Sequence, residues 1–287
     1  CEVEGDIWLQ RRVRSVATHR TDFAAGGIES FKIRRRCLAL PEGVNRPQVE
    51  ILALALHVVP SVATWKPDDV PDIDWLAHSY RQFPPFSVGP FFIYGSHYDG
   101  EVPPEQMGLQ IDAATAFGSG EHGTTKGCLQ AMLELKVQGV CPWNVLDMGT
   151  GSGILAIAAW KLWKTPVLAV DNDEESVRVT ERHRQSNKVP DGAPNLTSAH
   201  GDGFASNIAQ KKKPYELVIA NILAGPLKEM AADLKSVVDD NGYVILSGIL
   251  ITQADDVLSI YQAQGLTLRK RYEIGEWSTL LLHNPPT

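Results

Sequence analysis

The chain has 287 residues, of which 44% are hydrophobic and 21% are charged. This composition is typical of globular proteins and excludes the disordered and fibrous classes. The formal net charge of −7 argues against nucleic-acid binding through bulk positive charge, so we expect no direct sequence-specific contact with nucleic acid. The longest apolar stretch, residues 51–59, is interrupted by His57. It is far shorter than the ~20 residues that span a bilayer, so no membrane segment is expected.

Three proline-bearing stretches divide the first third of the chain, at residues 65–69, 83–86 and 102–104. Proline removes a backbone donor and restricts the residue before it, so these stretches are typical of boundaries between elements. We therefore expect a small domain over residues 1–70, a linker and connecting segment over residues 71–110, and a larger domain over residues 111–287.

From residue 144 onward, short apolar runs alternate with helix-length segments. Strands are predicted at residues 145–146, 167–170, 196–199, 217–220 and 243–246, and helices at residues 154–162, 174–187, 223–238 and 252–264. Continuous apolar strands separated by helices indicate an α/β fold, whose parallel sheet is covered on both faces. Right-handed crossovers then bring the strand-to-helix loops to one edge, where ligands bind. Residues 266–272 and 277–283 are expected to form a hairpin that completes the sheet.

The four cysteines have no spacing that suits a zinc site, and we expect no metal; they are Cys1, Cys37, Cys128 and Cys141. They are typical of reduced thiols, which predicts a cytoplasmic protein.

A glycine-rich run, D-M-G-T-G-S-G at residues 147–153, follows the first strand of the larger domain. Glycines let a backbone adopt positive φ and approach a ligand closely. The helix that begins after this run supplies free N–H groups at its N-terminus, which favour a carboxylate or a phosphate.

Two cofactors fit this loop. A dinucleotide fingerprint needs G-x-G-x-x-G/A and an acid ~20 residues further on, and Gly151 and Asp171 satisfy that spacing. The alternative is the G-x-G-x-G loop of S-adenosylmethionine enzymes, in which Asp147 helps to hold the loop and the ammonium group of the ligand. Asp171 suits both, since it can bind ribose hydroxyls in either case. Asp147 favours the second, because an acid at that point would repel a pyrophosphate.

Four segments together closely resemble the ribosomal protein L11 methyltransferase family: residues 112–129, 147–159, 220–226 and 246–250. The most specific of them is the A-N-I-L-A-G-P run at residues 220–226. The similarity extends over about residues 74–283 and implies a seven-stranded Rossmann-like methyltransferase domain with a smaller N-terminal α+β domain. In that family the small domain recognises the substrate, which gives residues 1–70 that expected role.

The cofactor of the family is S-adenosylmethionine, and the resemblance implies contacts to it from four matching positions: Thr125, Gly149, Asp171 and Asn221. Gly151 belongs to the same glycine loop. Phe117 is expected to pack beside the sulfonium, and Asp202 to accept a hydrogen bond from the adenine amino group. A simple turn residue between two glycines is the alternative for Asp202.

The resemblance implies methyl transfer to lysine side chains and to the N-terminal α-amine of ribosomal protein L11. Asn221 is followed here by I-L-A, whereas amide-methylating relatives have N-P-P-Y, and this difference favours an amine acceptor. We expect Asn221 to accept a hydrogen bond from that amine, with no obligatory catalytic base, in a monomeric enzyme. A plain helix cap is the alternative role for Asn221. Other functions remain open: a methyltransferase with a different acceptor, a nicotinamide-dependent oxidoreductase, or a binding module without turnover.

Overall fold

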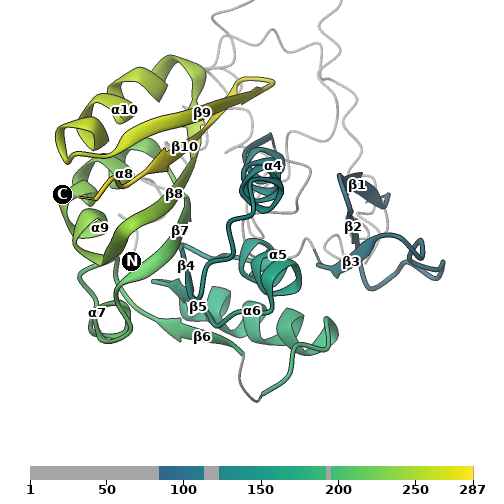
Figure 1. Cartoon of the computed structure of the whole chain (residues 1–287). Coiled ribbons are helices and arrows are strands. Elements are labelled where there is room, and N and C mark those ends of the chain that lie inside the picture. The colour runs from purple at the N-terminus through teal and green to yellow at the C-terminus, as the bar shows by residue number, and fades with distance from the viewer. Residues whose placement is uncertain (1–83, 113–122, 192–194, 287) are drawn as a thin grey trace, which may run out of the picture. The chain divides into compact units, whose positions relative to one another are not determined.

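The computed structural model describes residues 84–112, 123–191 and 195–286. All of them belong to the unit Pro71–Thr287, and the predicted small domain over residues 1–70 lies outside the described residues. The described part of the chain contains a seven-stranded sheet and a separate three-stranded sheet (Figure 1).

The seven-stranded sheet has the order β6-β5-β4-β7-β8-β10-β9. Its strands are β4 (Val145–Met148), β5 (Val167–Asp171), β6 (Leu196–His200), β7 (Tyr215–Asn221), β8 (Val238–Leu250), β9 (Thr267–Ile274) and β10 (Trp277–His283). The first five are parallel, while β10 runs antiparallel to both of its neighbours, β8 and β9. The chain passes from β4 outward to β6 and then returns to β7, so the strand order reverses beside β4. This is the switch point at which α/β proteins bind ligands. The sheet and the C-terminal hairpin confirm the predicted Rossmann-like class.

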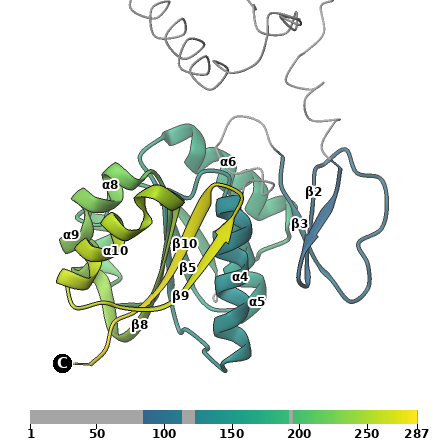
Figure 2. The same ribbon diagram turned by 90° about the horizontal axis from the view of Figure 1, so that it is seen from above.

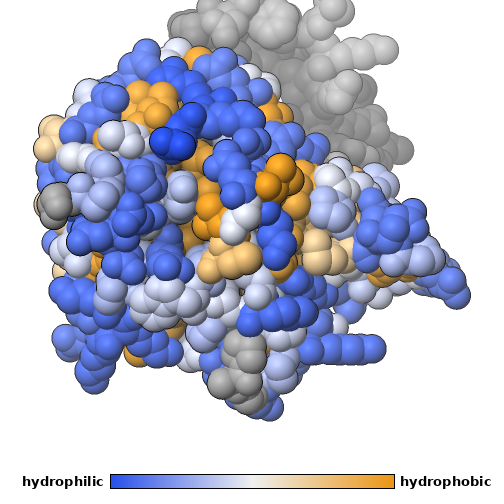
Figure 3. Space-filling model, in the orientation of Figure 1, coloured by the Kyte–Doolittle hydropathy of each residue, from blue (hydrophilic) through white to orange (hydrophobic). Residues whose placement is uncertain are grey.

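Helices cover both faces of this sheet, as Figure 2 shows. They are α4 (Gly123–Val137), α5 (Ile154–Trp163), α6 (Glu174–Ser186), α7 (Asn207–Lys211), α8 (Ala224–Glu229), α9 (Ala231–Val237) and α10 (Ala254–Ala263), with a short 3₁₀ helix, η3 (Ile251–Gln253), before α10. Every residue of β4 and β5 is buried. Alternate residues face opposite layers: Val145 packs with α4 and α5, whereas Leu146 packs with α8, α9 and α10. On the face drawn in Figure 3, most side chains are hydrophilic and the hydrophobic ones gather near its centre.

Part of the segment that was predicted as a linker forms a three-stranded sheet. Its strands are β1 (Phe86–Val88), β2 (Phe91–Tyr94) and β3 (Met107–Gln110). Phe91, Ile93 and Leu109 are buried in the same core as α4 and α5. The prolines lie between or before these short strands, so they mark turns of a folded segment.

Two helices differ from their predicted ranges. The helix predicted over residues 223–238 is divided at Met230 into α8 and α9, and Leu223 is extended instead of helical. The helix predicted over residues 252–264 begins with the 3₁₀ turn η3 and becomes α-helical at Ala254. Across the described residues, no helix has the length and apolar character of a membrane span.

Candidate functional site

The parallel strands of the large sheet end at one edge, and three of the predicted site residues lie at strand ends there. Gly149 follows β4, Asp171 ends β5, and Asn221 ends β7. Asn221 is paired in register with Ser247 of β8. The ends of β4, β5 and β7 and the glycine loop therefore lie together at the carboxyl edge of the sheet, where the strand order reverses.

The glycine loop requires glycine at several points. Gly149, Gly151 and Gly153 have φ values of 70°, 56° and 78°, all in the left-handed region. A Cβ on Gly149 would lie 2.3 Å from Cγ2 of Ile222, and one on Gly153 would lie 2.9 Å from Cγ2 of Thr180. The loop is thus packed on both sides, and α5 begins directly after it.

Asp171 binds the glycine loop and can still accept further hydrogen bonds. Its Oδ2 accepts a hydrogen bond from the N–H of Gly151 at 2.8 Å, and its Oδ1 accepts one from the N–H of Asp173 at 3.0 Å. A carboxylate has about four lone-pair sites, so two remain for a ligand. The side chain is therefore fixed in direction before any ligand arrives.

Asp147 is buried beneath the loop with one oxygen unsatisfied. Its Oδ2 accepts hydrogen bonds from the hydroxyl of Thr150 at 2.7 Å and from the N–H of Ala156 at 3.1 Å. Its Oδ1 is buried and has no hydrogen-bond partner among the residues that the structure describes. Burial, together with the charge of Asp171, raises the pKa of Asp147 to about 7 against the opposing hydrogen bonds.

Thr125 lies in the first turn of α4 and is fully buried, yet within the described part of the chain its hydroxyl also has no hydrogen-bond partner. The start of α4 is held at the end of β8, because the hydroxyl of Ser247 donates to the carbonyl of Thr124 at 3.2 Å. An unpaired buried polar group costs about 1–3 kcal/mol. Thr125 and Asp147 therefore each lack a partner that a polar ligand can supply.

The turn after β7 is packed between two glycines. The side chain of Ile222 covers Gly149, while its backbone lies against Gly248, where a Cβ would be 2.2 Å from the Ile222 carbonyl oxygen. Asn221 is partly exposed, and its side chain makes no hydrogen bond within the described ranges. Leu223, beside it, is 65% exposed. The sequence predicts no role for Ile222 or Gly248; the available signal was the S-G pair at residues 247–248, near the end of β8.

Asp202 and Phe117 are the remaining predicted residues. Asp202 is exposed in the bend after β6, without a side-chain hydrogen bond in the part of the chain that is described. Phe117 lies outside the described residues. Among those described, no group of three or more His, Cys, Asp or Glu side chains could hold a metal ion.

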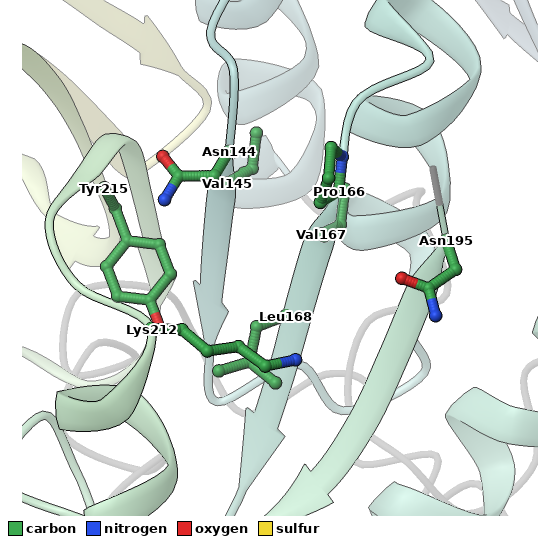
Figure 4. A pocket seen from close by; sticks show the side chains of 8 residues that line it. All are labelled: Asn144, Val145, Pro166, Val167, Leu168, Asn195, Lys212 and Tyr215. Carbon is green, nitrogen blue, oxygen red and sulfur yellow. The ribbon is translucent and has the colours of Figure 1, made fainter. Parts of the chain in front are cut away.

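A small cavity of about 40 Å³ opens at the opposite edge of the sheet, at the amino ends of β4 and β5 (Figure 4). It is lined by Asn144, Val145, Pro166, Val167, Leu168, Asn195, Lys212 and Tyr215. The amide of Asn144 is engaged with the backbone of Pro214 and Glu216. A volume of this size suits one or a few water molecules, so it does not compete with the carboxyl edge as a ligand site.

Known proteins show the same combination of sequence and fold. The family model described as "Ribosomal protein L11 methyltransferase (PrmA)" matches residues 44–285. A ribosomal protein L11 methyltransferase of Rhodopseudomonas palustris (strain BisB5) is 42% identical over 285 residues, covering 98% of this chain and 95% of that protein. One from Brucella suis is 42% identical over 215 residues, covering 75% of this chain and 74% of that protein.

Among solved structures, the ribosomal protein L11 methylase of Lactobacillus delbrueckii subsp. bulgaricus matches with a TM-score of 0.62 and 28% identity. The match covers 71% of this chain and 100% of that one. The family model spans most of the chain and a full-length relative shares two fifths of its residues. The chain therefore belongs to the ribosomal protein L11 methyltransferase family.

Proposed function

We propose that this protein transfers methyl groups from S-adenosylmethionine to ribosomal protein L11, at lysine side chains and at the N-terminal α-amine. Membership of the family supports the reaction and the substrate. The observation that supports the choice of cofactor is that two buried polar atoms, the hydroxyl of Thr125 on α4 and the Oδ1 of Asp147 beneath the glycine loop, have no hydrogen-bond partner among the described residues.

The residues present fit this cofactor better than a dinucleotide. The free Oδ1 of Asp147 suits an ammonium group, and the hydroxyl of Thr125 suits the polar end of an amino acid. The two unused acceptor sites of Asp171 suit a ribose diol. A pyrophosphate would instead meet the carboxyl group of Asp147, which disfavours an oxidoreductase that uses a dinucleotide. Phe117 and Asp202 are assigned to the sulfonium and adenine ends of the same ligand.

When bound, the cofactor supplies an electrophilic methyl group on a sulfonium centre. The chain's contribution is to orient the acceptor: the amide oxygen of Asn221 accepts a hydrogen bond from the incoming amine, which directs its lone pair. Leu223 offers an apolar surface to the aliphatic part of a lysine side chain. A lysine amine in water has a pKa of ~10.4 and is mostly protonated at pH 7, and desolvation at the site lowers that pKa.

No obligatory general base is needed in this scheme. Orientation of two reactants contributes about 7–11 kcal/mol, more than a positioned base supplies. We further propose that residues 1–70 recognise L11, and that the protein acts as a monomer in the cytoplasm.

The direct test is to incubate the purified protein with methyl-labelled S-adenosylmethionine and the ribosomal proteins. We expect label on L11, and mass spectrometry should locate it at lysines and at the N-terminus. Label on another ribosomal protein but not on L11 would overturn the substrate, and no label on any protein would overturn the activity.

Thr125→Val is expected to stabilise the free protein while weakening cofactor binding. Valine has the same shape and removes a buried hydroxyl that has no partner, so unfolding free energy should rise by about 1 kcal/mol. The affinity for S-adenosylmethionine should fall about tenfold with the lost hydrogen bond. Denaturation and calorimetry measure the two effects.

The matched control is Thr180→Val, because the Thr180 hydroxyl is equally buried but donates to the carbonyl of Gly151 at 3.1 Å. Its removal should lower stability. If Thr125→Val instead destabilises the free protein as much as Thr180→Val does, the Thr125 hydroxyl already has a hydrogen-bond partner in the free protein, which contradicts its assignment to the cofactor.

The affinity for S-adenosylmethionine is expected to fall as the pH falls below about 7, the pKa to which burial raises Asp147. A protonated carboxyl cannot pair with an ammonium group, so the loss should approach tenfold per pH unit and vanish above that pKa. The stability of the free protein should depend on pH in the opposite direction. A raised pKa means that stability from Asp147 is full below its ordinary value and is lost as the pH rises through about 7.

Calorimetric titrations between pH 5.5 and 8.5 measure this dependence, and Asp147→Asn should bind weakly at every pH with a flat profile. A wild-type affinity that does not change across pH 7 would contradict the assignment of Asp147 to the ammonium group.

A further inference from the structure

Side chains from two helices occupy the free edge of β3. One edge of β3 pairs with β2 in parallel register. At the other edge, Lys161 of α5 donates to the carbonyl of Gly108. Asn187, which ends α6, accepts from the N–H of Gln110 at 3.0 Å and donates to its carbonyl at 2.8 Å. Gly108 and Gln110 are two residues apart, so their polar groups point to the same edge. These side chains therefore make hydrogen bonds to the β3 backbone that a neighbouring strand would otherwise make.

His183 of α6 binds the backbone at the next alternate residue, Asp112, and it also binds the glycine loop. Its Nε2 accepts a hydrogen bond from the N–H of Asp112 at 3.1 Å. Its Nδ1 lies 2.7 Å from the carbonyl oxygen of Ser152, in the glycine loop. A backbone N–H can only donate, so Nε2 is the acceptor and the proton is on Nδ1, which donates to Ser152. The buried ring therefore joins the end of β3 to the loop.

The same face of α6 makes a second contact with the loop. Thr180, one turn before His183, donates to the carbonyl of Gly151. Two successive loop carbonyls are therefore held by α6, which fixes the orientation of their peptide groups. Burial lowers the pKa of His183 and so maintains the neutral ring that both of its hydrogen bonds require.

We propose that His183 is a positioning residue that couples the glycine loop to β3. A ligand bound in the loop strengthens the hydrogen bond to Asp112, and that bond in turn favours the liganded loop. This inference rests on the proposed function, since S-adenosylmethionine is the ligand. The coupling is reciprocal by necessity, so it is measurable from either end.

Two substitutions separate the two hydrogen bonds of the ring. The amide of an asparagine reaches the position of Nδ1, so His183→Asn keeps a donor for Ser152 and loses the acceptor for Asp112. The longer glutamine reaches the position of Nε2, so His183→Gln keeps the acceptor and loses the donor. Asn187→Ala is the control: it removes the hydrogen bonds to Gln110 and one to the backbone carbonyl of His183, but leaves both hydrogen bonds of the His183 ring in place.

The readout is hydrogen exchange at the Asp112 amide, measured by NMR with and without saturating S-adenosylmethionine. In the wild type we expect the cofactor to slow this exchange about fivefold, the equivalent of one ordinary hydrogen bond. The cofactor should not change exchange at the Asp112 amide in either His183 variant, because each variant has lost one of the two hydrogen bonds that join Asp112 to the glycine loop. In Asn187→Ala exchange at Gln110 should be faster, while the cofactor effect at Asp112 persists.

The coupling is refuted if the cofactor leaves exchange at Asp112 unchanged in the wild type, which needs no variant to fold. It is equally refuted if the cofactor slows that exchange as much in His183→Gln as in the wild type. Calorimetry on the same samples tests the proposed function separately. A wild-type protein that does not bind S-adenosylmethionine refutes the proposed function, but not the hydrogen bonds of His183 to Asp112 and Ser152.

Discussion

Gly248→Ala is expected to reduce kcat by about 100-fold or more, although Gly248 lies outside every predicted set of contact residues. Its φ is +81°, and a Cβ there would lie 2.2 Å from the carbonyl oxygen of Ile222 and 2.7 Å from its carbonyl carbon. The backbone of Ile222 must therefore move, taking with it Asn221 and the side chain that covers Gly149. A displacement of about 1 Å at a positioned reactive group costs about 100-fold in rate.

Gly265→Ala is the matched control for this variant. Gly265 has a similar φ of +87°, but a Cβ there would meet nothing within 4 Å. Both alanines bear the left-handed strain of about 1–2 kcal/mol, so the difference between them isolates the contact with Ile222. Chemical denaturation should show that Gly248→Ala is the less stable of the two, and steady-state methyl transfer, measured where both variants remain folded, should show very different turnover. Equal activity in the two variants would contradict the proposed alignment of the turn after β7.

Asn221→Ala is expected to lower kcat about 100-fold while changing the affinity for S-adenosylmethionine by less than tenfold. The substitution removes the acceptor that we propose directs the amine, and the other proposed cofactor contacts stay in place. Because the side chain of Asn221 is partly exposed and makes no hydrogen bond within the described residues, its loss should cost little stability.

The measurement is the rate of L11 methylation with saturating cofactor, alongside calorimetric titration of the cofactor. Unchanged turnover would remove Asn221 from the mechanism. A loss of cofactor affinity equal to the loss of turnover would make it a cofactor ligand and not an amine-orienting residue.

The layered architecture was predictable because buried parallel strands leave a strong sequence pattern. The apolar runs at β4, β5 and β7 are continuous, since both of their faces are covered by helices. The strand ends follow from that pattern, and so Asp171 and Asn221 could be placed at the carboxyl edge in advance. The glycine loop was equally visible, because positive φ at Gly149, Gly151 and Gly153 restricts the residue type.

Contacts between segments that are distant in the sequence were not predictable in this way. Nothing in the residues around Ile222 indicates that it packs against Gly149 and Gly248. His183 stands in a charged helix, and its two partners are 31 and 71 residues away. Prolines favour a linker and connecting segment over residues 71–110, and the sequence does not show that β1 to β3 pair within it and bury apolar side chains.

The most direct test of the central claim, that the carboxyl edge binds an amino-acid nucleoside, is calorimetric titration of the purified protein with S-adenosylmethionine and, separately, with NAD. We predict saturable binding of S-adenosylmethionine at a single site, abolished or strongly weakened by Asp171→Ala, and no binding of NAD. Saturable binding of NAD without binding of S-adenosylmethionine would contradict the account.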